Sequence, residues 1–381
     1  MKTLVIAEKP SVARDIARVL GCAKKENGAL EGNQYIVTWA LGHLVTLKDP
    51  EDYDKKYKEW NMAVLPMMPE KLQIKVIPQT GKQYHAVTTQ LARKDVNEIV
   101  IATDAGREGE LVARWILDKA HNQKPCKRLW ISSVTDKAIR EGFASLKDAK
   151  EYDNLYRAAV SRAEADWLVG INATRALTCK YNAQLSCGRV QTPTLAMIAQ
   201  REQEIREFVP KPYYTVTAAA GGAVYTWKDE KSGGTRISDP EKAKQIAEKA
   251  KRYPLVLQKV EKKKKQKEAP LLYDLTELQR DASARFGYSA KQTLNLMQSL
   301  YETHKVLTYP RTDSRYLTKD IVPTLKERLD AVSIGPYKAL AQQAKRSPLN
   351  GKLSFVNDAK VSDHHAIIPT EQYVQLSTLS N

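Results

Sequence analysis

The chain has few cysteines and no long apolar run, and both shortages narrow the class of protein. Its 381 residues include four cysteines, Cys22, Cys126, Cys179 and Cys187. No pair has the C-x-x-C spacing of a zinc site, and their scatter does not indicate a disulfide framework. Reduced thiols and a cytoplasmic location are therefore expected. The apolar stretch after Met1 is too short for a signal peptide, and no stretch is long enough to span a bilayer.

The sequence also lacks a phosphate-binding loop and is short of acidic residues. Without a G-x-x-x-x-G-K-[ST] motif, no ATP site is expected. Sixty-one Lys and Arg against 44 Asp and Glu give a net charge of +17, which favours a polyanionic partner, most simply nucleic acid. An anionic membrane is the competing partner, but no clearly amphipathic basic helix supports it. The length and a mean hydropathy of −0.50 predict a soluble globular protein of two or three domains.

Strands alternate with helices near the amino terminus, which predicts a mostly parallel sheet. The expected strands are residues 2–7, 98–103 and 127–132. In such sheets the chemistry lies at the carboxyl ends of the strands. Glu8 and Asp104 fall at such ends, and Glu108 lies one helical turn beyond Asp104. Three carboxylates at one edge would suit Mg²⁺, although each one alone is also explained as a charge favoured at a helix amino terminus.

The middle of the chain combines a long helical pattern with a glycine-containing polar motif. A helix or helix pair is expected over residues 152–180. In the motif that follows, Gly188 permits close backbone approach, Arg189 suits a phosphate, and small hydroxyls suit phosphate oxygens. Trp167 on the helix is open to two interpretations, stacking on a base or packing in a core, and Trp60 shares this ambiguity.

The character changes from Pro210 onward. Residues 213–219, 223–228 and 255–260 are expected to be strands, with glycine-rich turns between them. Residues 261–268 carry five lysines, which we interpret mainly as a solvated strand end that runs into a linker rather than as a DNA-tracking patch. A helical pattern returns at Asp274.

This last helical segment carries the most informative residue of the chain, Tyr309. Pro310 pushes Tyr309 toward an extended conformation, so that its phenol projects from a turn or strand end. Arg311 places a permanent planar cation, suited to a phosphate, near the same point. A nucleophile next to a phosphate clamp suggests covalent phosphoryl transfer. The alternative is an ordinary Tyr-Pro turn, which these few residues alone would favour but the rest of the chain does not.

Several motifs together resemble those of a known family. Ile6–Ser11 and Ala102–Glu110 resemble the two signatures of the Toprim domain of type IA DNA topoisomerases, among which the bacterial topoisomerase III group is most similar. Leu185–Thr194 resembles the main DNA-contact motif of this family, and residues 363–370 resemble a motif near its active site. The second Toprim signature usually has two aspartates and a glutamate at alternate positions. Gly106 stands here where the second aspartate is expected.

The resemblance implies a multidomain α/β plus α fold. A Toprim Rossmann-like parallel sheet is expected over residues 1–148, and a helical DNA-path segment over 149–209. A β-rich arch segment is expected over 210–268, and a helical domain that carries the catalytic tyrosine over 269–381. In the resembling proteins later residues return through the arch, so the sequence is interpreted as an amino-terminal portion.

The resemblance also implies an activity: ATP-independent breakage, strand passage and rejoining of one DNA strand through a 5′-phosphotyrosine, which relaxes negative supercoils and separates linked rings. Tyr309 would be the nucleophile and Arg311 would stabilise the transition state. Lys9 would protonate the leaving 3′ oxygen, and Glu8 would relay a proton. One Mg²⁺ would be held by Glu8, Asp104 and Glu108. The expected DNA contacts are Trp60, Arg107, Arg162, Trp167, Arg175, Ser186, Gly188, Arg189, Val190, Gln191, Thr192, Asp313 and His364.

The partner implied is mainly single-stranded DNA, with a helicase as a further partner and the bacterial cytoplasm, near the nucleoid, as the location. Two other functions stay open at this point. A Toprim nuclease or primase would use the carboxylates but has no role for Tyr309 and Arg311. A non-catalytic fragment that binds single-stranded DNA would result if Gly106 and the shortened chain abolish activity.

Overall fold

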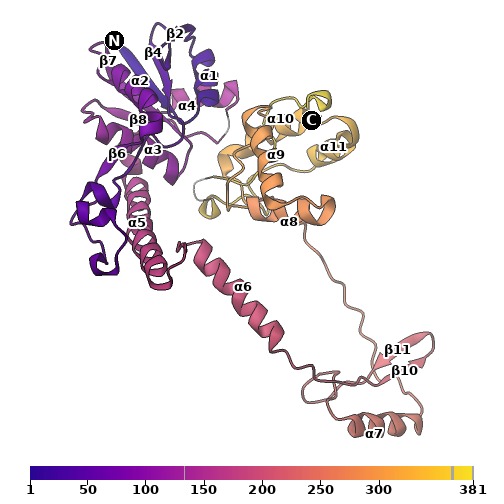
Figure 1. The fold of residues 1–381 in the computed structure, drawn as a ribbon. Coiled ribbons are helices and arrows are strands. Elements are labelled where there is room, and N and C mark those ends of the chain that lie inside the picture. Colours follow the sequence, from indigo (N-terminus) through magenta and orange to yellow (C-terminus); the bar gives the residue numbers. More distant parts are fainter. Residues whose placement is uncertain (133, 362–363, 380–381) are drawn as a thin grey trace. The chain divides into compact units, whose positions relative to one another are not determined.

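The computed structural model describes residues 1–132, 134–361 and 364–379, and the chain divides into two compact units. The first unit joins Met1–Arg189 with Pro270–Asn381, and the second comprises Val190–Ala269. Figure 1 labels the elements of both units. The first unit is therefore discontinuous in sequence, and its two segments meet around the candidate site.

Within the described residues, a seven-stranded sheet forms the centre of the amino-terminal segment, with the order β2-β3-β4-β1-β7-β8-β9. Its strands are β1 (Lys2–Ala7), β2 (Lys24–Glu26), β3 (Ala29–Glu31), β4 (Tyr35–Trp39), β7 (Val96–Ala102), β8 (Cys126–Arg128) and β9 (Lys147–Asp148). Strand β1 runs parallel to β4 and β7, and β7 runs parallel to β8, whereas the outer neighbours pair antiparallel. The predicted parallel centre is confirmed. Because Ala7 lies opposite Ala102, the carboxyl ends of β1 and β7 are adjacent.

Helices cover both faces of this sheet (Figure 1). They are α1 (Pro10–Val19), α2 (Gly81–Leu91), α3 (Arg107–Lys119) and α4 (Asp136–Ala144). The side chains of β1 alternate between the two cores. Leu4 and Ile6 pack with α2 and α3, while Val5 and Ala7 pack with α1 and α4. A strand that is buried on both faces reads as a continuous apolar run, which is the pattern of residues 2–7.

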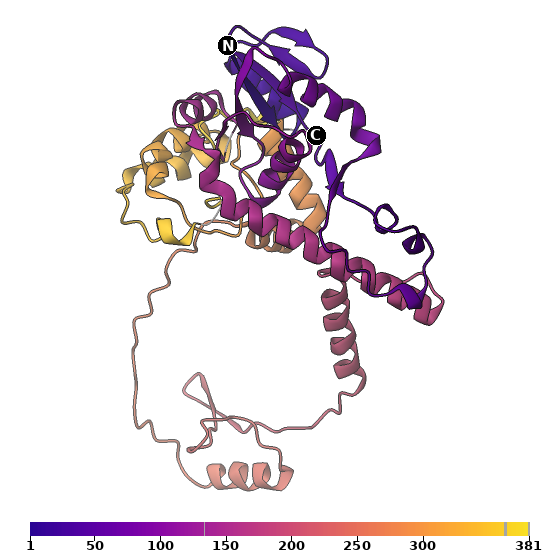
Figure 2. The same cartoon turned by 90° about the vertical axis from the view of Figure 1, so that its left-hand side faces the viewer.

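Two further elements extend this segment. Strands β5 (Val45–Leu47) and β6 (Ile74–Val76) pair antiparallel as a separate ribbon. The long helix α5 (Asp153–Tyr181) packs along α3 (Figure 2). The helix expected over residues 152–180 is confirmed.

The segment after Pro270 is mainly helical. Its helices are α8 (Leu275–Phe286), α9 (Ala290–Glu302), α10 (Leu325–Ala331) and α11 (Lys338–Arg346). Asp274 caps α8, because its side chain accepts a hydrogen bond of 2.7 Å from the backbone N–H of Glu277. Near the end of α9, Tyr301 is 5% exposed and packs in the same core as Val5 and Ala7. Helix α9 is thus anchored on the sheet domain immediately before Tyr309.

The second unit has fewer strands than the sequence predicts. It contains α6 (Gln191–Arg206), the hairpin of β10 (Thr217–Ala220) and β11 (Ala223–Thr226), and α7 (Pro240–Lys251). The strand expected over residues 255–260 is wrong: no described residue pairs with this stretch, and a strand forms only where a neighbour satisfies its backbone groups. Helix α7 was not expected. Asp239 as its cap and Pro240 at its first position were the signals for it.

Candidate active site

Two carboxylates meet at the carboxyl edge of the sheet. Glu8 follows β1 and Asp104 follows β7, and the Glu8 Oε2 accepts a hydrogen bond of 3.1 Å from the backbone N–H of Asp104. Burial, together with the nearby charge of Asp104, raises the pKa of Glu8 to about 7. The position of strand ends in the sequence therefore predicted this pair correctly.

Glu108 does not join the pair. It lies in the first turn of α3, its side chain is 60% exposed, and its Oε2 is 3.7 Å from Nε2 of His43. Among residues 1–132, 134–361 and 364–379, no group of three or more His, Cys, Asp or Glu side chains is placed to hold a metal ion. The expected set of three ligands is therefore not brought together in this structure.

The two remaining carboxylates fit Mg²⁺ by their chemistry. Glu8 and Asp104 offer hard oxygen ligands, and Mg²⁺ commonly binds through one or two carboxylates while it keeps several waters. The raised pKa of Glu8 shows that burial and the neighbouring carboxylate disfavour its charge. A divalent cation between the two groups would offset that repulsion.

A buried arginine holds the loop that carries Asp104. Arg128 is fully buried, and its guanidinium donates 2.7 Å hydrogen bonds to the carbonyls of Thr103 and Asp104. Its Nε donates to Oε1 of Glu110, another fully buried group, at 2.5 Å. The loop is closed further by a 2.8 Å bond from the Thr103 hydroxyl to the carbonyl of Gly109. Sequence reasoning missed Arg128 and Glu110. Charged residues within apolar strand and helix patterns were the available signal.

Lys9 lies between carboxylates from the two segments of the first unit. Its Nζ donates a 2.7 Å hydrogen bond to Oε1 of Glu302, at the end of α9, and lies 3.4 Å from Oδ2 of Asp104. Burial disfavours the ammonium charge, but the carboxylates of Asp104 and Glu302 outweigh it and raise the pKa of Lys9. Sequence reasoning missed Glu302, which belongs to none of the motifs.

The ring of Tyr309 is held by aromatic neighbours. It lies edge-on to Tyr301 with ring centroids 5.4 Å apart, and 4.3 Å from the ring of His364. The backbone N–H of Tyr309 donates a 2.9 Å hydrogen bond to the carbonyl of Ser132, just beyond β8. The tyrosine segment is thereby attached to the edge of the sheet that carries the carboxylates.

The charged groups near the Tyr309 phenol shift its pKa in opposite directions. Burial and the carboxylate of Asp104 raise the pKa of Tyr309 to about 12, while Arg311 and Lys9 lower it. The phenol is therefore protonated at neutral pH. The cations on either side are the groups that would stabilise its anion during a reaction.

A cavity of about 470 Å³ opens beside Arg311. Its lining residues are Arg107, Asp274, Leu275, Thr276, Leu294, Arg311, Thr312, Asp313 and His364. His364 is 7% exposed, and its Nδ1 has no hydrogen-bond partner among the described residues. Two exposed arginines, Arg107 and Arg311, line the same cavity. Their guanidiniums are donors that suit a phosphate group. Asp363, the neighbour of His364 in the motif, lies outside the described residues.

The expected DNA contacts on α5 and in the polar motif that follows it are found in different environments. Arg189 is exposed and forms a two-pronged ion pair with Asp166, at 2.6 and 3.1 Å. Arg162 lines a cavity of about 430 Å³ that Glu108 and Trp167 also line. The polar motif runs from the end of the first unit into the second, and Ser186, Val190, Gln191 and Thr192 are exposed there, with Gly188 half-buried.

Two of these expected contacts, Arg175 and Trp167, are largely buried. Arg175 is 5% exposed, donates a 2.5 Å hydrogen bond to the carbonyl of Tyr57, and lies over the ring of Trp60. Trp167 is 8% exposed, and its indole N–H donates to the carbonyl of Lys48 at 2.9 Å. Both side chains hold α5 to the loop that contains Lys48 and Tyr57, so a contact of either one with DNA stays a prediction. Trp60 is 50% exposed, and its stacking on a base stays a prediction.

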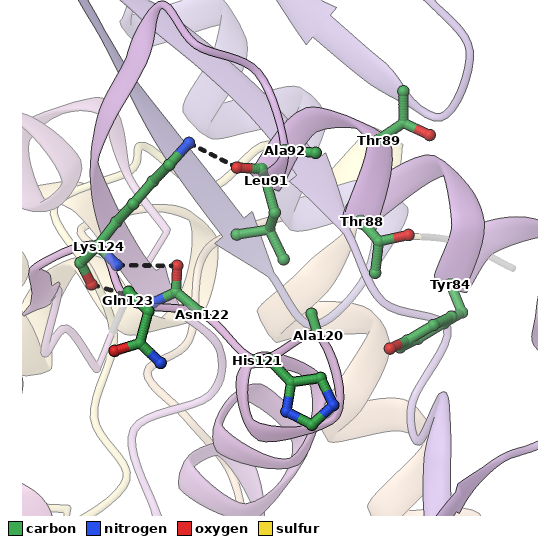
Figure 3. Close-up of a pocket in the computed structure, with 10 residues that line it drawn as sticks. All are labelled: Tyr84, Thr88, Thr89, Leu91, Ala92, Ala120, His121, Asn122, Gln123 and Lys124. Atoms are coloured by element: carbon green, nitrogen blue, oxygen red, sulfur yellow. Dashed lines mark hydrogen bonds between the residues drawn. The ribbon is translucent and has the colours of Figure 1, made fainter.

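A larger cavity lies elsewhere, beside the carboxyl end of α2 (Figure 3). It measures about 620 Å³, and Lys124 and Asn122 are among its lining residues. The ammonium of Lys124 donates to the carbonyls of Leu91 and Arg93, at 2.5 and 2.7 Å, and the amide of Asn122 bonds the backbone of Lys124. The polar groups of these two side chains are therefore engaged within the protein.

Comparisons with known proteins identify relatives of this chain. A family model described as DNA topoisomerase matches residues 150–381, and the Toprim domain model matches residues 3–134. DNA topoisomerase 3 of Bacillus subtilis (strain 168) is 62% identical over 380 residues, which is 100% of this chain and 52% of that protein. DNA topoisomerase 3 of Shouchella clausii (strain KSM-K16) is 62% identical over 382 residues, again 52% of its length. The chain thus spans about half the length of the curated relatives it matches.

A solved structure supports the fold. Full-length topoisomerase I from Thermotoga maritima is similar with a TM-score of 0.63 and 23% sequence identity, over 96% of this chain and 55% of that one. At this identity the likeness shows the multidomain α/β fold alone. Within the described residues no helix combines the length and apolar character needed to cross a membrane.

Proposed function

Since this chain belongs to the type IA DNA topoisomerase family, we propose that it breaks and rejoins one DNA strand, without ATP, through a covalent bond between Tyr309 and a 5′ phosphate. One observation carries the proposal. The phenol of Tyr309 lies where the charges of Asp104, Lys9 and Arg311 all act on its pKa. The charges of the residues that we propose as proton donor and cationic stabiliser therefore both act on the phenol that we propose as nucleophile.

The cleavage step follows from these groups. The Tyr309 hydroxyl loses its proton to solvent, and we propose that Glu8 relays this proton. The Tyr309 Oη then attacks the phosphorus. The bond between phosphorus and the 3′ oxygen breaks, and that oxygen takes a proton from Nζ of Lys9. In rejoining, the 3′ hydroxyl gives its proton to Lys9 and attacks the same phosphorus, and the phenolate that leaves takes back a proton from solvent through Glu8. One ester replaces another in each direction, so no ATP is needed.

Arg311 and the adjoining cavity provide the grip on the phosphate. With a pKa of about 12, Tyr309 needs its developing negative charge stabilised, and the planar guanidinium of Arg311 suits two phosphate oxygens. Arg107 and His364 line the same cavity, and we propose that they hold the neighbouring backbone phosphates. Removal of one donor of this kind costs about 3 kcal/mol of transition-state stabilisation.

Glu8 and Asp104 are the residues that would hold Mg²⁺, which would supply positive charge to stabilise the reacting phosphate. Gly106 has no side-chain ligand to add, and Glu108 points toward His43. A single metal ion held by the two carboxylates is therefore our proposal for this site.

We also propose single-stranded DNA as the bound form. The net charge of +17 and the exposed guanidiniums of Arg107, Arg189 and Arg311 favour a phosphate backbone. Relaxation of supercoils and separation of linked rings are proposals for the whole protein, of which this chain spans about half the length seen in its relatives. The helicase partner and the location beside the nucleoid stay predictions.

The test is a denaturing gel after incubation with end-labelled single-stranded DNA. We expect a covalent protein–DNA adduct that disappears in Tyr309→Phe, while DNA affinity stays within about twofold, because affinity comes mainly from phosphate contacts. An adduct that persists in the variant would move the nucleophile elsewhere. Free cleaved ends without an adduct would favour a Toprim nuclease, and no product at all would favour a DNA-binding fragment.

A further inference from the structure

Lys9 is held by a carboxylate from the tyrosine segment. We propose that Glu302 is a positioning residue for cleavage: its carboxylate keeps the ammonium of Lys9 where the leaving 3′ oxygen takes up its proton. This inference rests on the proposed function and assigns a role to a residue outside the motifs. It makes proton donation depend on two segments that lie 293 positions apart in the sequence.

The contacts of Glu302 are those of an anchored group. Its Oε1 accepts the 2.7 Å hydrogen bond from Lys9 and a second bond from the side-chain amide of Gln298, one helical turn earlier on α9. The Glu302 side chain is 25% exposed and that of Lys9 is 31% exposed, so the pair is partly shielded from solvent. A carboxylate fixed by its own helix presents a defined point to which the flexible lysine binds.

The second carboxylate near Lys9 explains why this anchor matters. The Lys9 Nζ is 3.4 Å from Oδ2 of Asp104, compared with 2.7 Å from Glu302. If Glu302 is removed, the nearest remaining anion is Asp104, on the loop proposed to bind metal. The ammonium is then drawn toward that carboxylate and away from the leaving oxygen. A long side chain with four rotatable bonds also regains rotamer freedom when it loses an anchor.

The residue before Glu302 ties the same contact to the nucleophile. Tyr301 is buried in the core of the sheet domain, and its ring lies edge-on to the ring of Tyr309. Consecutive residues at the end of α9 therefore contact the attacking group and the proton donor. Both contacts exist only while α9 lies against the sheet. The positions of Tyr309 and Lys9 for cleavage therefore depend on the packing of the tyrosine segment against the sheet domain.

The proposal is tested by changing the acidity of the leaving group in the DNA substrate. When sulfur replaces the bridging 3′ oxygen at the cleavage site, the departing group is a thiolate, which leaves without a proton because thiols are far more acidic than alcohols. Adduct formation is measured in single turnovers at saturating single-stranded DNA, with natural and sulfur-bridged oligonucleotides. The proteins are the wild-type chain, Glu302→Ala, Glu302→Gln, Lys9→Ala and Glu327→Gln.

Glu327→Gln is the matched control. Glu327 is a glutamate of α10 whose Oε2 is 2.8 Å from Nζ of Lys137 on α4, so it joins the same two segments without touching Lys9. On natural DNA we expect Glu302→Ala to be slower by about tenfold or more, a fraction of what general acid catalysis provides. Glu302→Gln, which keeps an acceptor oxygen, should lose less, and Glu327→Gln should match the wild type. On sulfur-bridged DNA, Lys9→Ala and both Glu302 variants should return to within about threefold of the wild type.

Other outcomes overturn the inference. If Glu302→Ala is slowed equally on both substrates, Glu302 acts on folding or DNA binding alone. If it is slowed on neither, Lys9 needs no such anchor. If sulfur does not rescue Lys9→Ala, Lys9 is not the proton donor and Glu302 has nothing to position. If the wild type forms no adduct with either DNA, the proposed function itself fails, which is a separate result.

Discussion

Gly109 fixes the position of the loop that carries Asp104, and Gly109→Ala should distort it. A methyl group built on Gly109 would lie 1.9 Å from the carbonyl oxygen of Asp104 and 2.9 and 3.0 Å from its carbonyl carbon and nitrogen. All three are backbone atoms, so no change of side-chain rotamer relieves the clash. The loop itself has to move.

The size of the effect follows from these distances. An ordinary contact begins at 3.4 Å, so the carbonyl oxygen has to shift by about 1.5 Å. That shift breaks the 2.7 Å hydrogen bond from fully buried Arg128, and a buried charged donor left without its partner costs about 2 kcal/mol. With the strain of overpacking, we expect the free energy of unfolding to fall by about 3 kcal/mol.

Gly106→Ala is the matched control in the same loop. A methyl group there has one neighbour within 4 Å, Nε2 of His364 at 3.8 Å, and the backbone is extended with φ of 175°. Any residue adopts that conformation, so this variant should be as stable as the wild type or more stable by about 0.5 kcal/mol. Urea unfolding of both variants is the measurement. If Gly109→Ala proves as stable as Gly106→Ala, the loop is not held as tightly as its contacts indicate.

Two further predictions concern the phosphate cavity. Arg311→Lys should slow adduct formation roughly 30-fold, which corresponds to about 2 kcal/mol of transition-state stabilisation, because lysine keeps the charge but cannot bind two phosphate oxygens at once. DNA affinity should fall much less. Equal losses of rate and affinity would show that Arg311 only binds DNA. Burial lowers the pKa of His364 to about 4 from its usual 6.5, so below the usual value the unfolded chain takes up a proton that the folded chain does not. The free energy of unfolding that neutral His364 contributes is therefore fully present above pH 6.5 and decreases as the pH falls. Near pH 5 the decrease is about 2 kcal/mol. Urea unfolding near pH 7 and near pH 5 should show this loss in the wild type and a smaller one in His364→Phe, whereas equal losses would assign the acid sensitivity to other groups.

The sheet domain and its carboxylate pair were predictable because they follow from local patterns. The apolar run of residues 2–7 identified a strand buried on both faces, and the alternation of strands and helices identified parallel neighbours. Parallel strands end at the same edge, so Glu8 and Asp104 had to lie close together once their strands were adjacent. No long-range information was needed for this part of the site.

Residues that act through long-range contacts were not predictable in the same way. Glu302 faces Lys9 only because Tyr301 anchors the end of α9 in the core of the sheet domain. No pattern within α9 distinguishes this glutamate from the others on exposed helix faces. Trp167 and Arg175 show the opposite difficulty, since an aromatic ring and a guanidinium suit DNA as well as a protein interior. In this structure both side chains are buried against the loop before α2, which the sequence pattern could not show.

The position of Glu108 follows from where a helix begins. Side chains at alternate positions share one face only while the backbone is extended, and α3 starts at Arg107, between Asp104 and Glu108. The helical turn carries Glu108 toward His43, while Asp104 stays beside Glu8. Gly106 offers no side chain in between, so Glu8 and Asp104 remain the acidic pair at this edge of the sheet. The ammonium of Lys9 lies 3.4 Å from Oδ2 of Asp104. A metal ion bound by Glu8 and Asp104 would compete with that ammonium for Asp104, and Glu302 provides Lys9 with a second anion when it does.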